Sequence, residues 1–165
     1  MIVNRQRAVR VSLQELEKFL RRARRALHLP IGAVTVCLVT DADMARWNRS
    51  YRGKNRATDV LSFPNSAESS GERNRVRSRS RKRRGEVKLK ARNSVSHYLM
   101  PCLGDIAIAP SVARRNARRL GRSLHDEIRI LMLHGMLHLM GYDHETDDGQ
   151  MDRRERRLRR LLGVA

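Results

Sequence analysis

The chain has 165 residues, of which 36 are Lys or Arg and 17 are Asp or Glu, so its formal net charge is +19 at pH 7. This length predicts one domain around a single core. The charge predicts nucleic acid as the partner, with a basic surface that only aids solubility as the alternative. The two cysteines, Cys37 and Cys102, exclude a disulfide framework or a C-x-x-C metal site and are predicted to be reduced core thiols.

Two helices and two strands are predicted in the first part of the chain. The capping pattern S-x-x-E at Ser12–Glu15 precedes apolar residues at helical spacing, which indicates an amphipathic helix that Pro30 ends. The apolar run AVTVCLV at 33–39 predicts a buried strand. Thr40 is typical of the cap of a second helix, and VLSFP at 60–64 predicts a second strand.

The C-terminal part predicts a third strand and three helices. The strand is GDIAIAP at 104–110, and a basic helix follows it and ends at Gly121. Ser123 and Asp126 repeat the capping pattern before the segment EIRILMLHGMLHLM at 127–140. This segment is apolar on nearly every face, which predicts a central buried helix. A last helix is predicted from about 147 to 162. This mixture of helices around a small sheet indicates an α/β or α+β layered domain.

Residues 65–100 differ from the rest of the chain because they contain few apolar side chains. Within them, residues 73–92 alone hold eleven Lys or Arg and one Glu. Repulsion between like charges predicts a disordered or extended basic insert. The insert is either an arm that binds RNA or a solvated loop, and the charge alone does not decide between them.

The N-terminal residues lack the apolar segment of a signal peptide, and no stretch of the chain approaches the roughly 18 apolar residues of a membrane span. We therefore expect a cytoplasmic protein with no membrane partner.

Three histidines lie within LMLHGMLHLMGYDH at 131–144. His134 and His138 are four residues apart and so share one face of a helix, while Gly141 breaks the helix and allows His144 to return as a third ligand. Three protein ligands with an open position are typical of a catalytic zinc site. A lone histidine in an apolar helix is usually a hydrogen-bonded core residue, but three at this spacing favour a metal centre.

The same spacing occurs in the zinc-protease pattern H-E-x-x-H-x-x-G-x-x-H. Gly135 stands where those proteases have their general-base glutamate, and it cannot accept a proton. A zinc metallopeptidase is therefore an alternative that this position and the basic charge oppose.

The segment HGMLHLMGYDH at 134–144 resembles the signature of the YbeY family of metal-dependent bacterial endoribonucleases. YRGKNRATDVLSFP at 51–64 and LGDIAIAP at 103–110 resemble the family's two other blocks in the same order. The likeness covers nearly the whole chain outside residues 65–100. The chain departs from the family's pattern in its strongly basic insert and in its basic last helix, DRRERRLRRLLG.

The resemblance implies a cytoplasmic hydrolase that cleaves single-stranded RNA in 16S rRNA 3′-end maturation and ribosome quality control. Its implied partners are ribosomal RNA, the small ribosomal subunit and assembly factors. A non-catalytic RNA-binding ribosome-assembly factor, in which zinc only braces the fold, is a second alternative. The resemblance also implies one zinc ion per chain, bound by His134, His138 and His144. The implied fold is zincin-like, with a small mixed four-stranded sheet and a central metal-binding helix.

Three further residues are candidates for the site. Arg52 matches the arginine that is critical for activity in the family, and a guanidinium at this position could bind the scissile phosphate through two hydrogen bonds. Lys54 is a candidate for substrate binding. Asp143 could orient a histidine or cap the turn. Because aromatic residues form only 4% of the chain, the phosphate backbone is expected to dominate recognition over base stacking.

Overall fold

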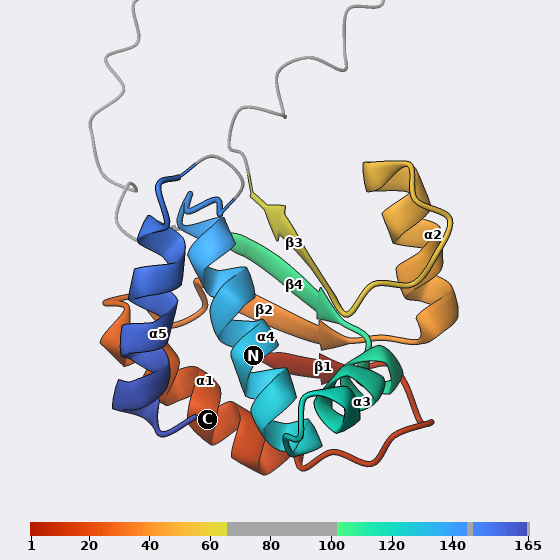
Figure 1. Ribbon diagram of the computed structural model, residues 1–165, viewed down its shortest axis with the longest axis horizontal. Coiled ribbons are helices and arrows are strands. Elements are labelled where there is room, and N and C mark those ends of the chain that lie inside the picture. The colour runs from red at the N-terminus through yellow and green to blue at the C-terminus, as the bar shows by residue number, and fades with distance from the viewer. Residues whose placement is uncertain (66–101, 145–146, 165) are drawn as a thin grey trace, which may run out of the picture.

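The structure is a computed structural model that describes residues 1–65, 102–144 and 147–164 (Figure 1). These residues contain a four-stranded sheet in the order β1-β2-β4-β3, with strands β1 (Ile2–Asn4), β2 (Val34–Leu38), β3 (Val60–Pro64) and β4 (Gly104–Ile108). Strands β1, β2 and β4 are parallel, and β3 pairs antiparallel with β4 at one edge. The small mixed sheet that the resemblance implies is therefore confirmed.

The described residues contain five helices, and each was predicted from the sequence. They are α1 (Leu13–Ala26), α2 (Asp41–Arg52), α3 (Pro110–Arg119), α4 (Leu124–Leu139) and α5 (Gln150–Leu162). Helix α5 begins three residues after the predicted start, because Gly149 adopts φ +76° as its N-cap. The carboxylate of Asp147 stays outside the helix and accepts a hydrogen bond from the backbone N–H of Met151 at 2.9 Å.

Three helices begin at the polar caps that the sequence predicts. The side chains of Ser12, Thr40 and Ser123 each accept a hydrogen bond from the backbone N–H three residues later, at 3.3, 3.1 and 3.0 Å. Each bond satisfies one of the N–H groups that a helix leaves unpaired in its first turn. Local sequence signals therefore determine where α1, α2 and α4 start.

The main core lies between one face of the sheet and helices α1, α4 and α5 (Figure 1). Side chains of β2 alternate between the two faces, so that Val34, Val36 and Leu38 are buried in this core. Cys37 instead contacts the smaller cluster on the other face, where α2 contributes Met44. Helix α4 is in contact with β3, β4 and three other helices, which confirms the prediction that it is buried. The site at its C-terminal end thus rests on a rigid element.

Two expectations from the sequence were wrong in detail. Strand β1 was not predicted from the residues, because it is only three residues long and exists through its parallel pairing with β2. The cysteines are not core thiols: Cys37 is only half-buried and Cys102 is exposed, and both are free.

The basic insert predicted at 65–100 lies almost entirely outside the described residues. Among the helices that the structure describes, none combines the length and the hydropathy of a membrane span.

Candidate metal centre

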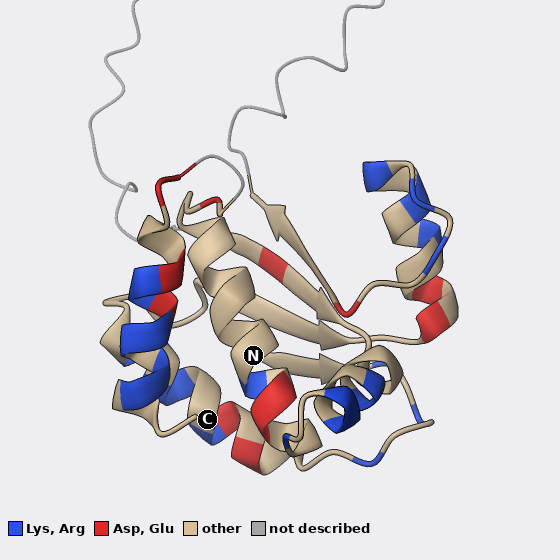
Figure 2. Cartoon of the chain, viewed as in Figure 1, with Lys and Arg blue, Asp and Glu red and all other residues tan. Residues whose placement is uncertain are grey.

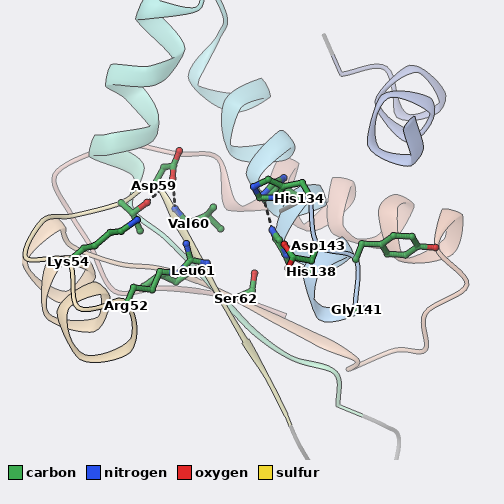
Figure 3. A pocket seen from close by; sticks show the side chains of 13 residues that line it. Arg52, Lys54, Asp59, Val60, Leu61, Ser62, His134, His138, Gly141 and Asp143 are labelled. Atoms are coloured by element: carbon green, nitrogen blue, oxygen red, sulfur yellow. Dashed lines mark hydrogen bonds between the residues drawn. The ribbon is translucent and has the colours of Figure 1, made fainter. Parts of the chain in front are cut away.

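Three histidines converge at the C-terminal end of α4, and Figure 3 labels two of them, His134 and His138. His134 and His138 lie one turn apart on the helix, and His144 lies in the segment that follows it. One ring nitrogen from each can be chosen so that all three lie within 4.8 Å of one another. The helical spacing and the return after Gly141 therefore bring the three predicted ligands together.

The chain reverses sharply after α4, which allows His144 to return. Gly141 adopts φ +88°, in the left-handed region that favours glycine. Its backbone N–H donates to the carbonyl of His138 at 2.9 Å, and the N–H of Tyr142 donates to that of Leu137 at 3.1 Å. This hydrogen-bonded ending is typical of a helix closed by glycine, and it fixes the direction in which the chain leaves α4.

The histidine cluster has the chemistry and the spacing that zinc requires. Nε2 of His134 lies 3.1 Å from Nε2 of His138. Two nitrogens that bind one zinc ion at about 2.0–2.1 Å in a tetrahedral arrangement lie roughly 3.3 Å apart, close to this separation. Three imidazoles without a thiolate also suit an open site better than a closed structural one. The cluster can therefore hold a metal ion.

The surroundings of His138 keep its ring in the form that binds metals. Burial lowers the pKa of His138 below its usual value, and the nearby rings of His134 and His144 lower it further. The charge of Asp143 opposes this shift but does not outweigh it. The shift favours the neutral ring of His138, which is the form that can coordinate a metal.

A buried carboxylate from α5 contacts the cluster. Oε2 of Glu155 lies 2.9 Å from Nδ1 of His134, and Arg159 pairs with the other carboxylate oxygen from one turn further along α5. Burial acts to raise the pKa of Glu155, but the hydrogen bond with His134 and the charge of Arg159 outweigh it and hold the pKa below the usual value. Sequence reasoning missed Glu155, because a lone Glu among arginines is typical of a solvated helix face.

A cavity of about 710 Å³ opens in front of the histidines, and Arg52 and Lys54 line its opposite wall (Figure 3). Both basic residues are exposed: Arg52 is the last residue of α2, and Lys54 lies two positions further along the chain. The structure thus brings together the histidines, Arg52, Lys54 and Asp143 around one pocket. Its other lining residues are Thr58, Asp59, Val60, Leu61, Ser62, Gly141 and Tyr142.

The segment that carries Arg52 and Lys54 is anchored by a buried side chain. Asn48 is 2% exposed, and its Nδ2 donates to the carbonyl of Arg56 at 2.7 Å. The backbone N–H of Lys54 donates to the carbonyl of Asn48 at 3.3 Å, and Gly53 ends α2 with φ +68°. Although the two basic side chains are exposed, the backbone that bears them is held in one conformation.

The distribution of charge differs between the two walls of the pocket. Figure 2 shows basic residues toward the C-terminal end of α2 and in the loop that follows it, and acidic residues at the start of α2 and in the loop between α4 and α5. Asp143 and Asp147 lie in that loop, close in sequence to His144. An anion in this pocket would therefore be attracted by Arg52 and Lys54 and, in the absence of a cation at the histidines, repelled by the other wall.

Gly135 stands where the zinc proteases have their general-base glutamate, and it faces the sheet. A Cβ atom built on Gly135 would lie 2.8 Å from Cγ2 and 2.9 Å from Cδ1 of Ile106 in β4. Ile106 is fully buried, so it has little room to move. The first side-chain atom of a glutamate at this position would overlap with the core residue Ile106. This argues against the peptidase alternative.

We expect Gly135→Ala to destabilise the protein although alanine is the better helix former. Overpacking a core costs about 1–3 kcal/mol, which exceeds the gain in helix propensity of at most about 1 kcal/mol. Urea unfolding of Gly135→Ala, Ile106→Ala and the double variant measures this coupling. In the Ile106→Ala background, Gly135→Ala is expected to be neutral or stabilising; an equal loss in both backgrounds would contradict the predicted overlap.

Comparisons with known proteins place the chain in a family. The family model described as endoribonuclease YbeY matches residues 1–163. The chain is 38% identical to endoribonuclease YbeY from Koribacter versatilis over 162 residues, which cover 98% of this chain and 85% of that protein. It is 32% identical to endoribonuclease YbeY from Aquifex aeolicus over 149 residues, which cover 90% and 80% of the two chains.

A solved structure is similar in fold. The solution structure of TM1509 from Thermotoga maritima superposes with a TM-score of 0.55 at 24% sequence identity, covering 99% of this chain and 90% of that one. The range matched by the family model, residues 1–163, contains the three histidines and Arg52. The chain therefore belongs to the YbeY family of endoribonucleases.

Proposed function

We propose that this protein is a zinc-dependent endoribonuclease that cleaves single-stranded RNA and acts in 16S rRNA 3′-end maturation and ribosome quality control. The observation that carries the proposal is the placement of three metal-competent histidines opposite Arg52 and Lys54 across one cavity. Metal and basic side chains are the two kinds of group that stabilise charge on a phosphodiester. Membership of the family supports RNA as the substrate.

In this proposal His134, His138 and His144 hold one zinc ion, and α4 is the metal-binding helix of a zincin-like arrangement. When bound, the zinc ion supplies a Lewis acid that lowers the pKa of water and neutralises charge on phosphoryl oxygens. The guanidinium of Arg52 binds and orients the scissile phosphate with two donors, and Lys54 adds a second positive charge beside it. Asp143 orients one of the histidine rings without binding the metal itself.

The wider setting is also part of the proposal. The whole chain acts as one catalytic domain in the cytoplasm, with the basic insert as an addition to it. Its partners are single-stranded ribosomal RNA, the small ribosomal subunit and assembly factors. The net charge of +19 supports a polyanionic partner, since such a field raises the rate of encounter with RNA.

A direct test is incubation of the purified, metal-quantified protein with single-stranded RNA, duplex RNA and casein. We expect cleavage of single-stranded RNA alone, its loss after chelation and its return on addition of zinc. Cleavage of casein but not RNA would favour the peptidase. Binding of RNA without cleavage by the zinc-loaded protein would favour the non-catalytic assembly factor.

A further inference from the structure

Glu155 occupies a position on α5 that is otherwise reserved for apolar side chains. The buried residues of this helix are Met151, Glu155, Leu158 and Leu162, spaced by four, three and four positions. Glu155 is only 6% exposed, although the helix around it is rich in exposed arginines. A buried carboxylate is costly unless it is paired, and a leucine would continue the apolar stripe. Burial of a charge at this position therefore points to a role that packing does not explain.

The contact with His134 fixes which ring nitrogen faces the cluster. A carboxylate can only accept hydrogen bonds, so the short Oε2–Nδ1 contact of 2.9 Å places a proton on Nδ1 of His134. In the neutral ring, Nε2 then carries the free lone pair. This same Nε2 is the atom that lies 3.1 Å from Nε2 of His138, inside the cluster. The carboxylate thus selects the tautomer and the ring orientation that coordination needs.

Arg159 holds the carboxylate in place. It pairs with Oε1 of Glu155, which leaves Oε2 directed at His134. Arg159 and Glu155 are four residues apart on α5, a spacing that brings their side chains together on one helix face. Helix α5 therefore presents a braced carboxylate to a ligand on α4, across the contact between the two helices.

We infer that Glu155 is the positioning residue of the metal centre: it holds His134 with Nδ1 protonated and Nε2 directed at the metal, and Arg159 braces it. The inference rests on the proposed metal-dependent function, and it assigns a role in that function to the basic last helix. Loss of such a partner behind a metal-bound histidine typically weakens metal binding by 10- to 100-fold.

The test separates positioning from packing through two substitutions at one site. Glu155→Leu continues the apolar stripe of α5 but removes the acceptor, whereas Glu155→Gln keeps an acceptor oxygen and removes the charge. We expect Glu155→Leu to keep the thermal stability of the metal-free wild type and to bind zinc roughly 10- to 100-fold more weakly in chelator competition. Glu155→Gln is expected to recover most of the affinity.

Two controls on the same helix match these changes. Asp152→Asn removes one negative charge from an exposed position of α5, and Leu158→Ala removes buried apolar volume. Asp152→Asn is expected to leave zinc affinity unchanged. Leu158→Ala is expected to lower stability while the folded fraction binds zinc as the wild type does.

Ring ¹⁵N NMR of the metal-free protein gives a readout that does not depend on zinc. In neutral to mildly alkaline buffer, the wild type is expected to carry the proton of His134 on Nδ1 and Glu155→Leu to shift it toward Nε2. Unchanged zinc affinity and an unchanged tautomer in Glu155→Leu would overturn the inference alone. A wild type that binds no zinc would overturn the proposed metal centre, and this inference with it.

Discussion

Replacement of His138 by alanine is expected to remove nearly all bound zinc and, with it, RNA cleavage. His138 belongs to the cluster and lies about one helical turn from His134, and its lowered pKa favours the neutral ring that can bind a metal. Two remaining imidazoles bind zinc far more weakly than three. The loss of zinc affinity is therefore expected to exceed roughly 100-fold, the largest loss that is typical for a residue that contacts a ligand but not the metal. Metal analysis after gel filtration measures it as zinc per chain.

Thermal unfolding gives a second measure of the same effect. Because zinc binds only the folded site, an excess of about 1,000 times the dissociation constant stabilises the wild type by about 4 kcal/mol. The melting temperature of His138→Ala is expected not to respond to the same zinc concentration. Its metal-free stability is expected to stay near that of the metal-free wild type, because the ring is only half-buried at the end of α4.

His125→Ala is the matched control for this prediction. His125 lies on the same helix, but its Nε2 accepts a hydrogen bond from the backbone N–H of Ser12 at 3.3 Å, outside the cluster. Its replacement is expected to leave zinc content unchanged. Full retention of zinc by the separate alanine variants of His134, His138 and His144 would contradict the assignment of the ligands.

The helices and most strands were predictable because their signals are local. The caps at Ser12, Thr40 and Ser123 lie within three residues of the N–H groups they satisfy, and apolar periodicity marks the buried faces. Strand β1 depends on residues more than 30 positions away in β2, and its three residues carry no alternating pattern. Pairings of this kind become visible only once the chain is folded.

The same distinction applies to the site. The convergence of the three histidines was predictable because helical geometry and a glycine-ended turn relate them over eleven positions. Glu155 was not, because its contact with His134 spans 21 residues and depends on how α5 packs against α4. Asp143, which the sequence suggested for the same role, lines the pocket beside His144, and its orienting role stays a prediction.

Replacement of Arg52 by alanine is expected to lower kcat for RNA cleavage by roughly 100- to 1,000-fold without loss of zinc. This is the usual cost of removing one donor that stabilises developing charge in a transition state. Arg52 lies on the wall opposite the histidines and is exposed, so its loss disturbs neither the metal ligands nor the core (Figure 3). Single-turnover cleavage at saturating RNA, with bound zinc measured in parallel, isolates this effect.

Arg49→Ala and Arg52→Lys show whether the effect belongs to the guanidinium of Arg52 or to general positive charge. Arg49 lies in the same last turn of α2 and is also exposed, but it does not line the pocket. Its loss is expected to weaken RNA binding slightly at low salt and to leave kcat unchanged. Arg52→Lys keeps the charge but loses the planar pair of donors, so it is expected to recover binding more than kcat. Equal losses of kcat in Arg49→Ala and Arg52→Ala would mean that the basic end of α2 acts only as an electrostatic surface, and that the scissile phosphate is positioned by other residues.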